Sequence, residues 1–195
     1  MSSVLKNNFT TVEQYLQDEL SRATKHELIE GDIYAMAGAS VNHERISLNI
    51  SRKFGNHLEG SPCEPFGSDM KVKVANNFFY PDVMVDCHFD ESQPYYTQTP
   101  TIIVEVLSKS TRRIDQTIKR IAYLNIASLQ EYVLIEQDFV DIEVMRRSEG
   151  WQSKHYFLGD ELTFAAIDLT LSVAEIYLRV QNEDMLNFLS NIAND

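Results

Sequence analysis

Two different spacings of hydrophobic residues run along this chain and predict which segments are helices and which are strands. Apolar residues three and four positions apart are typical of a helix with one buried face, and they predict helices over 10–20, 43–58 and 112–126. The same spacing predicts a helical part over 172–180, followed by a helical tail. The predicted buried stripe of the helix over 43–58 consists of Ile46, Ile50, Phe54 and Leu58.

Short runs rich in Val, Ile and aromatic residues, bounded by Gly, Pro, Asn or Ser, predict strands between these helices. In chain order, the predicted strands cover residues 26–30, 33–36, 69–74, 80–85, 102–107, 131–136, 140–145 and 151–158. The pair Gly31-Asp32 predicts a β-hairpin between the first two strands. The pair Asn76-Asn77 predicts a second hairpin, between 69–74 and 80–85.

Two of these strands carry one acidic residue in an otherwise apolar setting. Asp82 follows Pro81 near the start of one strand, and Glu105 lies inside the next. A carboxylate in a buried strand is costly to remove from water, so it usually has a cation, a metal or a hydrogen-bonding partner. Taken alone, Asp82 is explained as a strand cap, and Glu105 is explained as the partner of an arginine from the next helix. Together, with a lysine-bearing helix directly downstream, the two acids favour one shared divalent cation.

The length and composition indicate one soluble domain over residues 1–195, long enough to bury a proper core. No apolar run is long enough to span a membrane, and residues 1–8 lack the apolar core of a signal peptide. The two cysteines, Cys63 and Cys87, show no CxxC spacing. We therefore interpret them as reduced thiols of a cytoplasmic protein, with neither a zinc site nor a disulfide framework.

The net charge of −12 argues against nucleic-acid binding, because surfaces that bind nucleic acids are usually basic. The distribution of charge weakens this argument, since residues 109–120 hold five basic residues and only one acid. Lys109, Arg112 and Arg113 are therefore candidate contacts to phosphates. A solvated helix face is the plain alternative.

The elements from 43 to 136 have the order αβββαβ, with an acid on each of the second and third strands. This order resembles the PD-(D/E)XK, or restriction-endonuclease-like, superfamily. The motifs that extend the match are Glu27–Gly31, His43, Ser68-Asp69, Tyr80–Val83, Val104–Ser108, Ser110–Arg113 and Asp115, Lys119 and Tyr123. In this joint order they resemble the Uma-type family of restriction endonucleases. The implied fold is α/β, a mixed central sheet flanked by helices, with an N-terminal helix and hairpin and a C-terminal β-rich extension.

The resemblance implies a hydrolase that uses Mg²⁺ or Mn²⁺ to cut DNA phosphodiester bonds. Asp82 and Glu105 would be the metal ligands, because Mg²⁺ prefers oxygen donors, and the metal would activate water and neutralise charge on the phosphate. Glu27 and Asp69 match family positions near the site and would add a metal contact or support a ligand. His43, in the first turn of its helix, either faces the site or is a satisfied core residue.

The sequence departs from the superfamily pattern at the lysine expected two residues after the glutamate, because that position is Leu107. A lysine supplied by the following helix is a known variation of the superfamily, and Lys119 matches the Uma-type position. Lys109, which directly follows the strand, is the reserve candidate.

The helix over 112–126 has a predicted core stripe, with Lys119 on its flank as a surface residue whose long stem could reach over the sheet. The plain alternative for Lys119 is an ordinary ion pair with Asp115, one helical turn before it. The predicted core stripe of this helix consists of Ile114, Ile118, Ile121 and Ala122.

The first hypothesis is a DNA endonuclease with Asp82, Glu105 and Lys119 as catalytic residues, acting as a homodimer because a duplex has two strands to cut. The second is a catalytically degenerate nuclease fold that binds nucleic acid or regulates, which the missing strand lysine and the net acidity favour. The third is an acidic interaction module whose buried carboxylates are structural. Metal binding separates the first from the third, and cleavage separates the first from the second.

Overall fold

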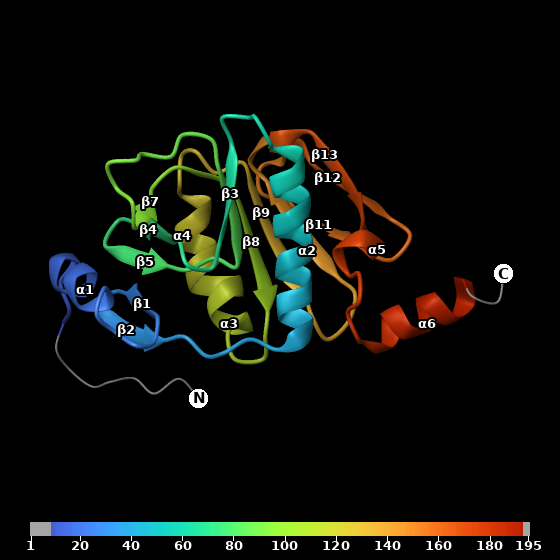
Figure 1. Cartoon of the computed structure of the whole chain (residues 1–195), viewed down its shortest axis with the longest axis horizontal. Coiled ribbons are helices and arrows are strands. Elements are labelled where there is room, and N and C mark those ends of the chain that lie inside the picture. The colour runs from blue at the N-terminus through green and yellow to red at the C-terminus, as the bar shows by residue number, and fades with distance from the viewer. Residues whose placement is uncertain (1–8, 193–195) are drawn as a thin grey trace.

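The computed structural model describes residues 9–192 and arranges them as two β-sheets, a small β-ribbon and helices on both sides of the larger sheet (Figure 1). The helices are α1 (Val12–Glu19), α2 (Val41–His57), α3 (Arg112–Ile114), α4 (Arg120–Leu124), α5 (Val173–Ile176) and α6 (Glu183–Ile192). Among the described residues, no helix is both long and apolar enough to cross a membrane. The N-terminal segment on which the cytoplasmic expectation partly rests lies outside the described residues.

The larger sheet has six strands in the order β11-β10-β9-β8-β6-β3. Their bounds are β3 (Glu64–Gly67), β6 (Val83–Asp86), β8 (Pro100–Leu107), β9 (Glu131–Glu136), β10 (Ile142–Arg146) and β11 (Ser153–Tyr156). Strands β8 and β9 pair in parallel, and the other neighbours pair antiparallel. The predicted mixed central sheet flanked by helices is therefore confirmed.

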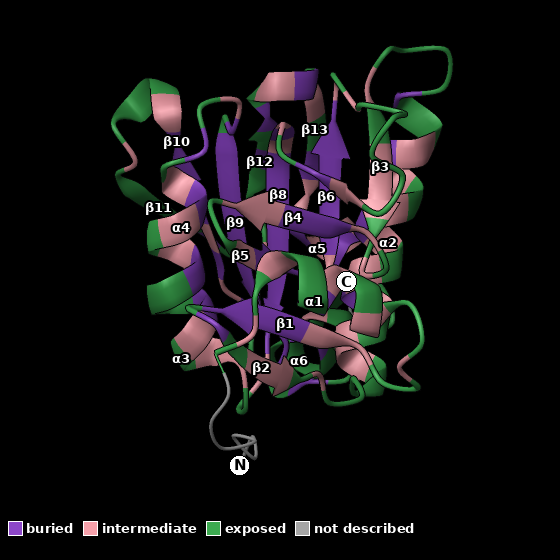
Figure 2. Ribbon diagram, turned by 90° about the vertical axis from the view of Figure 1, so that its left-hand side faces the viewer, coloured by how far each residue is buried: buried purple, intermediate pink, exposed green. Residues whose placement is uncertain are grey.

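The smaller sheet has five strands in the order β2-β1-β5-β4-β7, and it crosses in front of the larger sheet in Figure 2. Its strands are β1 (His26–Ile29), β2 (Asp32–Ala35), β4 (Lys71–Val74), β5 (Asn77–Phe79) and β7 (Tyr96–Thr97). A separate ribbon pairs β12 (Glu161–Phe164) with β13 (Leu169–Ser172). The hairpin predicted at Gly31-Asp32 is confirmed as β1 and β2.

The second predicted hairpin, between 69–74 and 80–85, is wrong. Strand β4 turns back at once into β5, because Ala75 adopts a left-handed conformation (φ 53°) that closes a tight turn. Strand β6 instead joins the larger sheet, between β3 and β8. Strand β3 was not predicted, because its Glu-Pro-Phe-Gly composition is unlike that of a buried strand.

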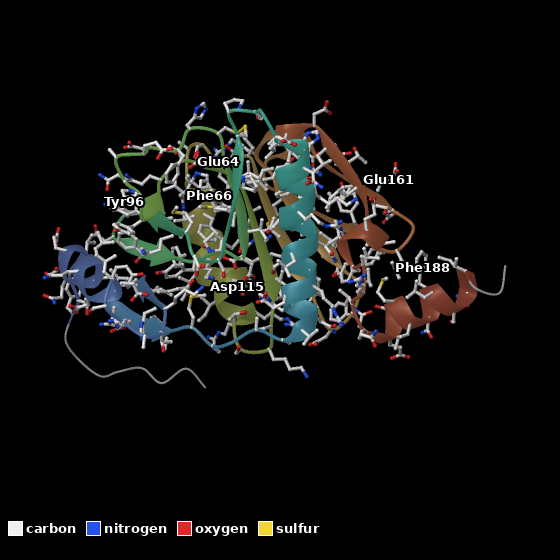
Figure 3. The ribbon with its side chains drawn as sticks, in the orientation of Figure 1. Glu64, Phe66, Tyr96, Asp115, Glu161 and Phe188 are labelled. Carbon is white, nitrogen blue, oxygen red and sulfur yellow. A yellow bond between two sulfur atoms is a disulfide. The ribbon has the colours of Figure 1, made fainter. Side chains whose placement is uncertain are left out.

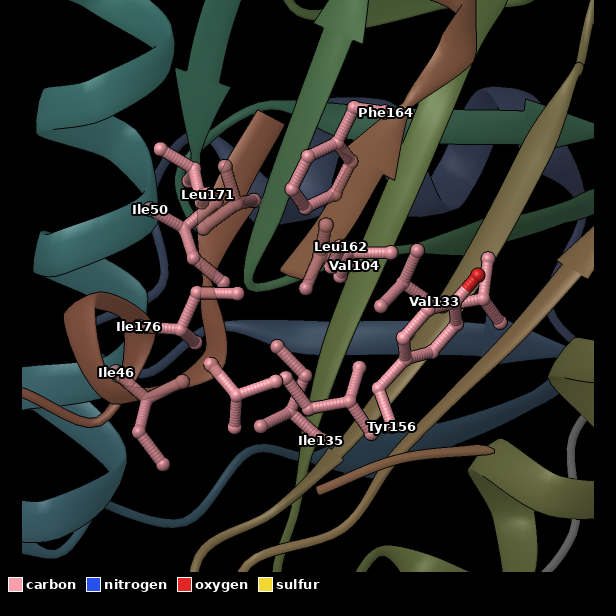
Figure 4. Close-up of a cluster of buried hydrophobic side chains, with 14 of the residues drawn as sticks. Ile46, Ile50, Val104, Val133, Ile135, Tyr156, Leu162, Phe164, Leu171 and Ile176 are labelled. Atoms are coloured by element: carbon pink, nitrogen blue, oxygen red, sulfur yellow. The ribbon is translucent and has the colours of Figure 1, made fainter. Parts of the chain in front are cut away.

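Helix α2 begins at the N-cap Ser40, whose hydroxyl accepts a hydrogen bond from the backbone N–H of His43. Its predicted stripe is confirmed, because all four residues are buried against one face of the larger sheet. The ribbon β12–β13 and α5 complete this core (Figure 4). The opposite face of the sheet is covered by α3, α4 and the π-helical segment η1 (Asp115–Lys119) that joins them.

The predicted stripe of the helix over 112–126 is wrong for two of its four residues, whereas Ile114 and Ala122 pack partly buried against the core. Ile118 and Ile121 are 42% and 69% exposed, whereas Asp115, Lys119 and Tyr123 are buried. The cause lies in η1, where the wider π-helical turn changes which side chains face the sheet. Polar residues therefore occupy the inner face of this helix.

The interpretation of the cysteines as reduced thiols is also wrong, since Cys63 and Cys87 form a disulfide. Cys63 precedes β3 and Cys87 follows β6, and these strands pair with Glu64 opposite Asp86. Extending that register by one residue sets the two cysteines opposite each other. The strand pairing, which the sequence spacing does not reveal, is what brings them together.

Glu175 provides a test of the packing of α5 on α2. Its carboxylate accepts hydrogen bonds from Lys53 of α2 and from Ser172 at the N-cap of α5, and these contacts lower its pKa from 4.5 to about 2. Glu175→Gln should lower the free energy of unfolding by about 0.5–1 kcal/mol near pH 7, since the side chain is nearly half exposed and therefore screened. Because the folded pKa is depressed, this difference should persist above about pH 4.5 and shrink as the pH falls towards 2.

Urea unfolding at several pH values measures this effect. Glu161→Gln is the matched control, because Glu161 is an exposed glutamate on β12. A loss that is equal for the two variants, or independent of pH, would contradict the assigned contact.

Candidate active site

The two strand acids lie on the same face of the larger sheet. Val83 of β6 pairs with Val104 of β8, so the next residues along, Asp82 and Glu105, stand opposite each other. Asp82 Oδ2 also accepts a hydrogen bond from the backbone N–H of Val106 at 2.7 Å, which fixes this carboxylate against β8. Glu105 is buried, whereas Asp82 retains partial access to solvent.

Lys119 reaches Glu105 from the helix that covers this face. Its ammonium Nζ lies 3.2 Å from Glu105 Oε1, 2.9 Å from Glu27 Oε1 and 3.2 Å from Asp115 Oδ1. The side chain is only 5% exposed, so the expectation of a surface lysine is wrong. The predicted contact of Lys119 with the site and its ordinary ion pair with Asp115 are thus both present.

Asp115 and Lys119 are the first and last residues of the π-helical segment, and both are buried. The backbone carbonyl of Asp115 accepts hydrogen bonds from the backbone N–H of Arg120 and from the hydroxyl of Tyr132 on β9, at 3.0 Å. Tyr132 thereby ties the wide turn to the sheet beneath it. Figure 3 marks Asp115 in the lower centre of the molecule, in the region of α3.

Two further side chains hold the carboxylates in place. Tyr123, one turn after Lys119, donates from its hydroxyl to Glu105 Oε1 at 3.1 Å. Glu27 comes from β1 of the smaller sheet, and its Oε1 also accepts from the backbone N–H of Tyr80 at 3.0 Å. The site is therefore assembled from both sheets and from the covering helix.

His43 extends from the first turn of α2 to Asp82, with 3.2 Å between its Nε2 and Asp82 Oδ2. Burial lowers the pKa of His43, but the hydrogen bond to Asp82 and the charges of Asp82 and Glu44 outweigh it, so the net shift is upward. Within the described part of the chain, its other ring nitrogen is buried without a hydrogen-bond partner. Of the two alternatives predicted for His43, the structure shows the one in which its side chain faces the site.

The remaining sequence candidates lie outside this cluster. The Asp69 side chain is 94% exposed and pairs with Lys25 at 2.7 Å, because the turn that carries it leads into β4 of the smaller sheet. Arg112 forms an ion pair with Glu136. Over residues 9–192, only Lys109 and Arg113 of the three predicted phosphate-binding residues are exposed and without an ion pair.

The clustered acids line one wall of a cleft of about 740 Å³. Much of the remaining lining is small or neutral, and it includes the segment 36–40 between β2 and α2. The cleft is open to solvent on the side of Asp82 and His43, which are both partly exposed. A substrate that enters here meets Asp82 before it meets the buried Lys119.

The acids of the cluster outnumber its one cation. Burial lowers the pKa of Lys119, but Glu105, Glu27 and Asp115 together outweigh burial and raise it well above its ordinary range, so the ammonium remains charged. Burial also raises the pKa of Glu105 well above its ordinary range, against the opposing effect of Lys119, and it raises the pKa of Asp115. One ammonium faces three carboxyl groups, so a further cation at the site would favour their ionised forms.

A divalent cation fits this donor set. Asp82 and Glu105 offer carboxylate oxygens on one face, and Glu27 and Asp115 add negative charge around them. Across residues 9–192, no group of three or more His, Cys, Asp and Glu side chains is arranged to hold a metal. Mg²⁺ does not require such a cage, because one or two carboxylates commonly hold it while water and substrate phosphates complete its shell.

Comparison with known proteins places the chain in a family. The Uma2 family, described as "Putative restriction endonuclease", matches residues 12–174. The chain belongs to the Uma2 family. Two uncharacterized proteins of Synechocystis, slr1290 and sll1609, are each 38% identical to it, over 170 and 142 residues. These matches cover 85% and 70% of this chain and 90% and 80% of those proteins.

The fold of this Uma2 protein also matches a solved structure. The crystal structure of a "putative nuclease belonging to DUF820" from Anabaena variabilis superposes with a TM-score of 0.71, covering 86% of this chain and 97% of that chain. The sequence identity is 16%, so this match shows a common fold. The predicted α/β architecture, a mixed central sheet flanked by helices, is therefore shared with that structure.

Sequence reasoning offered the Asp115–Lys119 pair, but it did not foresee that Asp115 is buried, that Tyr123 contacts Glu105 or that Tyr132 contacts the helix backbone. A usable signal was present, because Asp115, Lys119 and Tyr123 recur every four residues in a helix. The neighbouring stripe of this helix is more apolar, so the sequence favoured that stripe as the buried face. Tyr132 left no signal, because an aromatic residue in a buried strand is ordinary packing.

Removal of the buried ammonium tests this arrangement. Lys119→Met should lower the free energy of unfolding by about 3 kcal/mol near neutral pH, because it leaves buried carboxylates without their cation. Lys109→Met, a change of the same chemistry at an exposed residue, should alter stability by no more than about 0.5 kcal/mol. Urea unfolding compares the two variants, and equal small losses would show that Lys119 is not buried among acids.

Proposed function

We propose that this Uma2 protein is a divalent-metal-dependent endonuclease that hydrolyses DNA phosphodiester bonds. Its catalytic residues are Asp82, Glu105 and Lys119. The observation that carries the proposal is the contact between the Lys119 ammonium and Glu105, on the sheet face that Asp82 shares. The family and the fold support a nuclease, and the use of a metal and of DNA is the further step.

Asp82 and Glu105 would hold Mg²⁺ or Mn²⁺ through their carboxylates. When bound, such an ion supplies an activated water and neutralises charge that develops on the phosphate. His43 orients Asp82 through its Nε2, and Tyr123 orients Glu105 through its hydroxyl. These contacts restrict the rotamers of both carboxylates, as a preorganised site requires.

Lys119 would donate a hydrogen bond to the attacking water or to a non-bridging phosphate oxygen. Glu27 and Asp115 keep its ammonium charged at neutral pH. They also hold it from two sides, so its position beside Glu105 is fixed before substrate enters. A cation already held at this place would stabilise the negative charge that develops on the phosphate.

A second candidate is the catalytically degenerate nuclease fold, and one observation favours it. The Lys119 ammonium has three N–H groups and already contacts three carboxylates. A phosphate would have to compete with these carboxylates for the ammonium. The active enzyme would give up at least one of these contacts when substrate binds, whereas the degenerate protein keeps them unchanged.

A plasmid-nicking assay with Mg²⁺ or Mn²⁺ tests the proposal. Asp82→Asn and Glu105→Gln should each reduce cleavage by about 100-fold or more, because each removes a carboxylate that would hold the metal. Asp69→Asn is the matched control, since it makes the same change at an exposed residue away from the site, and it should cleave like the parent. A chelator should stop cleavage by every active variant.

Full activity of Asp82→Asn would contradict the assigned metal ligands. A parent protein that is folded yet inactive with every metal and substrate form would favour the catalytically degenerate nuclease fold. Circular dichroism of each variant separates a loss of chemistry from a loss of fold.

The salt dependence of DNA binding, measured with Ca²⁺ in place of Mg²⁺, tests the phosphate contacts. Arg113→Gln should reduce the slope of log affinity against log salt by about 0.9, the value for one lost phosphate contact. Arg112→Gln should change this slope less, because the Arg112 guanidinium is already paired with Glu136. Equal changes for the two variants would show that the Arg112 pair opens when DNA binds.

A further inference from the structure

The outer face of α2, opposite its buried stripe, carries apolar and charged residues in a repeating order. Val41 and Leu48 are 64% and 63% exposed, and they lie seven residues apart on this face. Glu44 and Arg52, also exposed, each lie one helical turn from Leu48, on opposite sides of it. We call these four residues the α2 outer stripe. An acidic residue, a central leucine and a basic residue thus follow one another along it.

This stripe is complementary to itself. If two copies of α2 pack antiparallel about a twofold axis at Leu48, residue 44 of one copy faces residue 52 of the other, on both sides of the axis. With a rise of 1.5 Å per residue, each charged residue lies about 6 Å along the helix from the axis. Two Glu44–Arg52 pairs would then flank a Leu48–Leu48 contact. A twofold interface requires such a patch, in which the same surface serves both subunits.

Within the described part of the chain, neither charge is neutralised by an ion pair. Glu44 and Arg52 are eight residues apart on one helix, too far to pair with each other. Over residues 9–192, neither side chain forms an ion pair or a side-chain hydrogen bond. Figure 1 shows α2 at the front of the molecule and Figure 2 shows it at the right-hand edge, so both views leave it on the outside.

The segment after α5 is held against α2. Asn49 of α2 donates to the backbone carbonyl of Leu178 at 2.9 Å. The Leu178 side chain is 48% exposed.

We propose that the α2 outer stripe is the interface of a homodimer, in which the two α2 helices pack antiparallel with Leu48 on the twofold axis. The partner is a second copy of this chain, because a second copy presents an arginine opposite Glu44 and a glutamate opposite Arg52 at the same spacing. The leucine supplies the buried apolar centre, and the charge pairs select the antiparallel orientation.

The interface has a consequence for the cleft. Glu44 and Leu48 are among the residues that line it. The dimer therefore places two clefts near its axis, related by the twofold. The proposal does not depend on nuclease activity, since it concerns assembly alone.

Sedimentation velocity of the full-length protein over a range of concentrations tests the interface. The parent should sediment as a dimer at about 10–100 μM, a concentration at which modest interfaces associate. Leu48→Asp should give a monomer, because it places two carboxylates at the axis. Leu20→Asp is the matched control, since Leu20 is also 63% exposed but lies at the end of α1, and it should leave the dimer intact.

Charge reversal tests the antiparallel orientation. Glu44→Arg and Arg52→Glu should each weaken the dimer at least tenfold, because each sets like charges against one another. The double variant should restore dimerisation to within about threefold of the parent, because both pairs are re-formed with reversed polarity. A monomeric parent, a dimeric Leu48→Asp variant or a double variant that remains monomeric would each overturn the proposal.

Discussion

One buried ammonium holds the candidate site together. Lys119 connects the smaller sheet through Glu27, the larger sheet through Glu105 and the covering helix through Asp115. A charge of this kind is stable away from water only when it is paired, and here the acids outnumber it. The same contact therefore fixes the relative position of three elements and leaves negative charge for a further cation. Structure and proposed chemistry depend on a single side chain.

The helix that carries Lys119 adapts its backbone to this requirement. The π-helical segment turns Asp115 and Lys119 inward, and Tyr132 binds the carbonyl that this segment presents to the sheet. As a consequence, two apolar side chains of this helix, Ile118 and Ile121, are exposed to solvent although they have the spacing of a buried stripe. A local arrangement that is unfavourable for packing is typical of functional sites, where other interactions compensate for it.

The sequence predicted the parts of this protein that depend on regular apolar spacing. The stripe of α2 is buried as expected, and Asp82 and Glu105 share a sheet face because their strands are neighbours. The burial of Lys119 was not predictable, since its helix offers a more apolar face that the ion cluster overrides. The disulfide was missed for a related reason, because the short strand β3 carries Pro65 and Gly67 and does not have the composition of a strand.

The central claim is that Asp82 and Glu105 hold one divalent cation beside Lys119. A crystal structure grown with Mn²⁺ and measured at its absorption edge tests it most directly. The account predicts one anomalous peak within about 2.0–2.6 Å of an oxygen of each carboxylate, with the Lys119 ammonium still in the cluster. A structure of saturated crystals with no peak at these carboxylates, and with Lys119 still bound to all three acids, would contradict it.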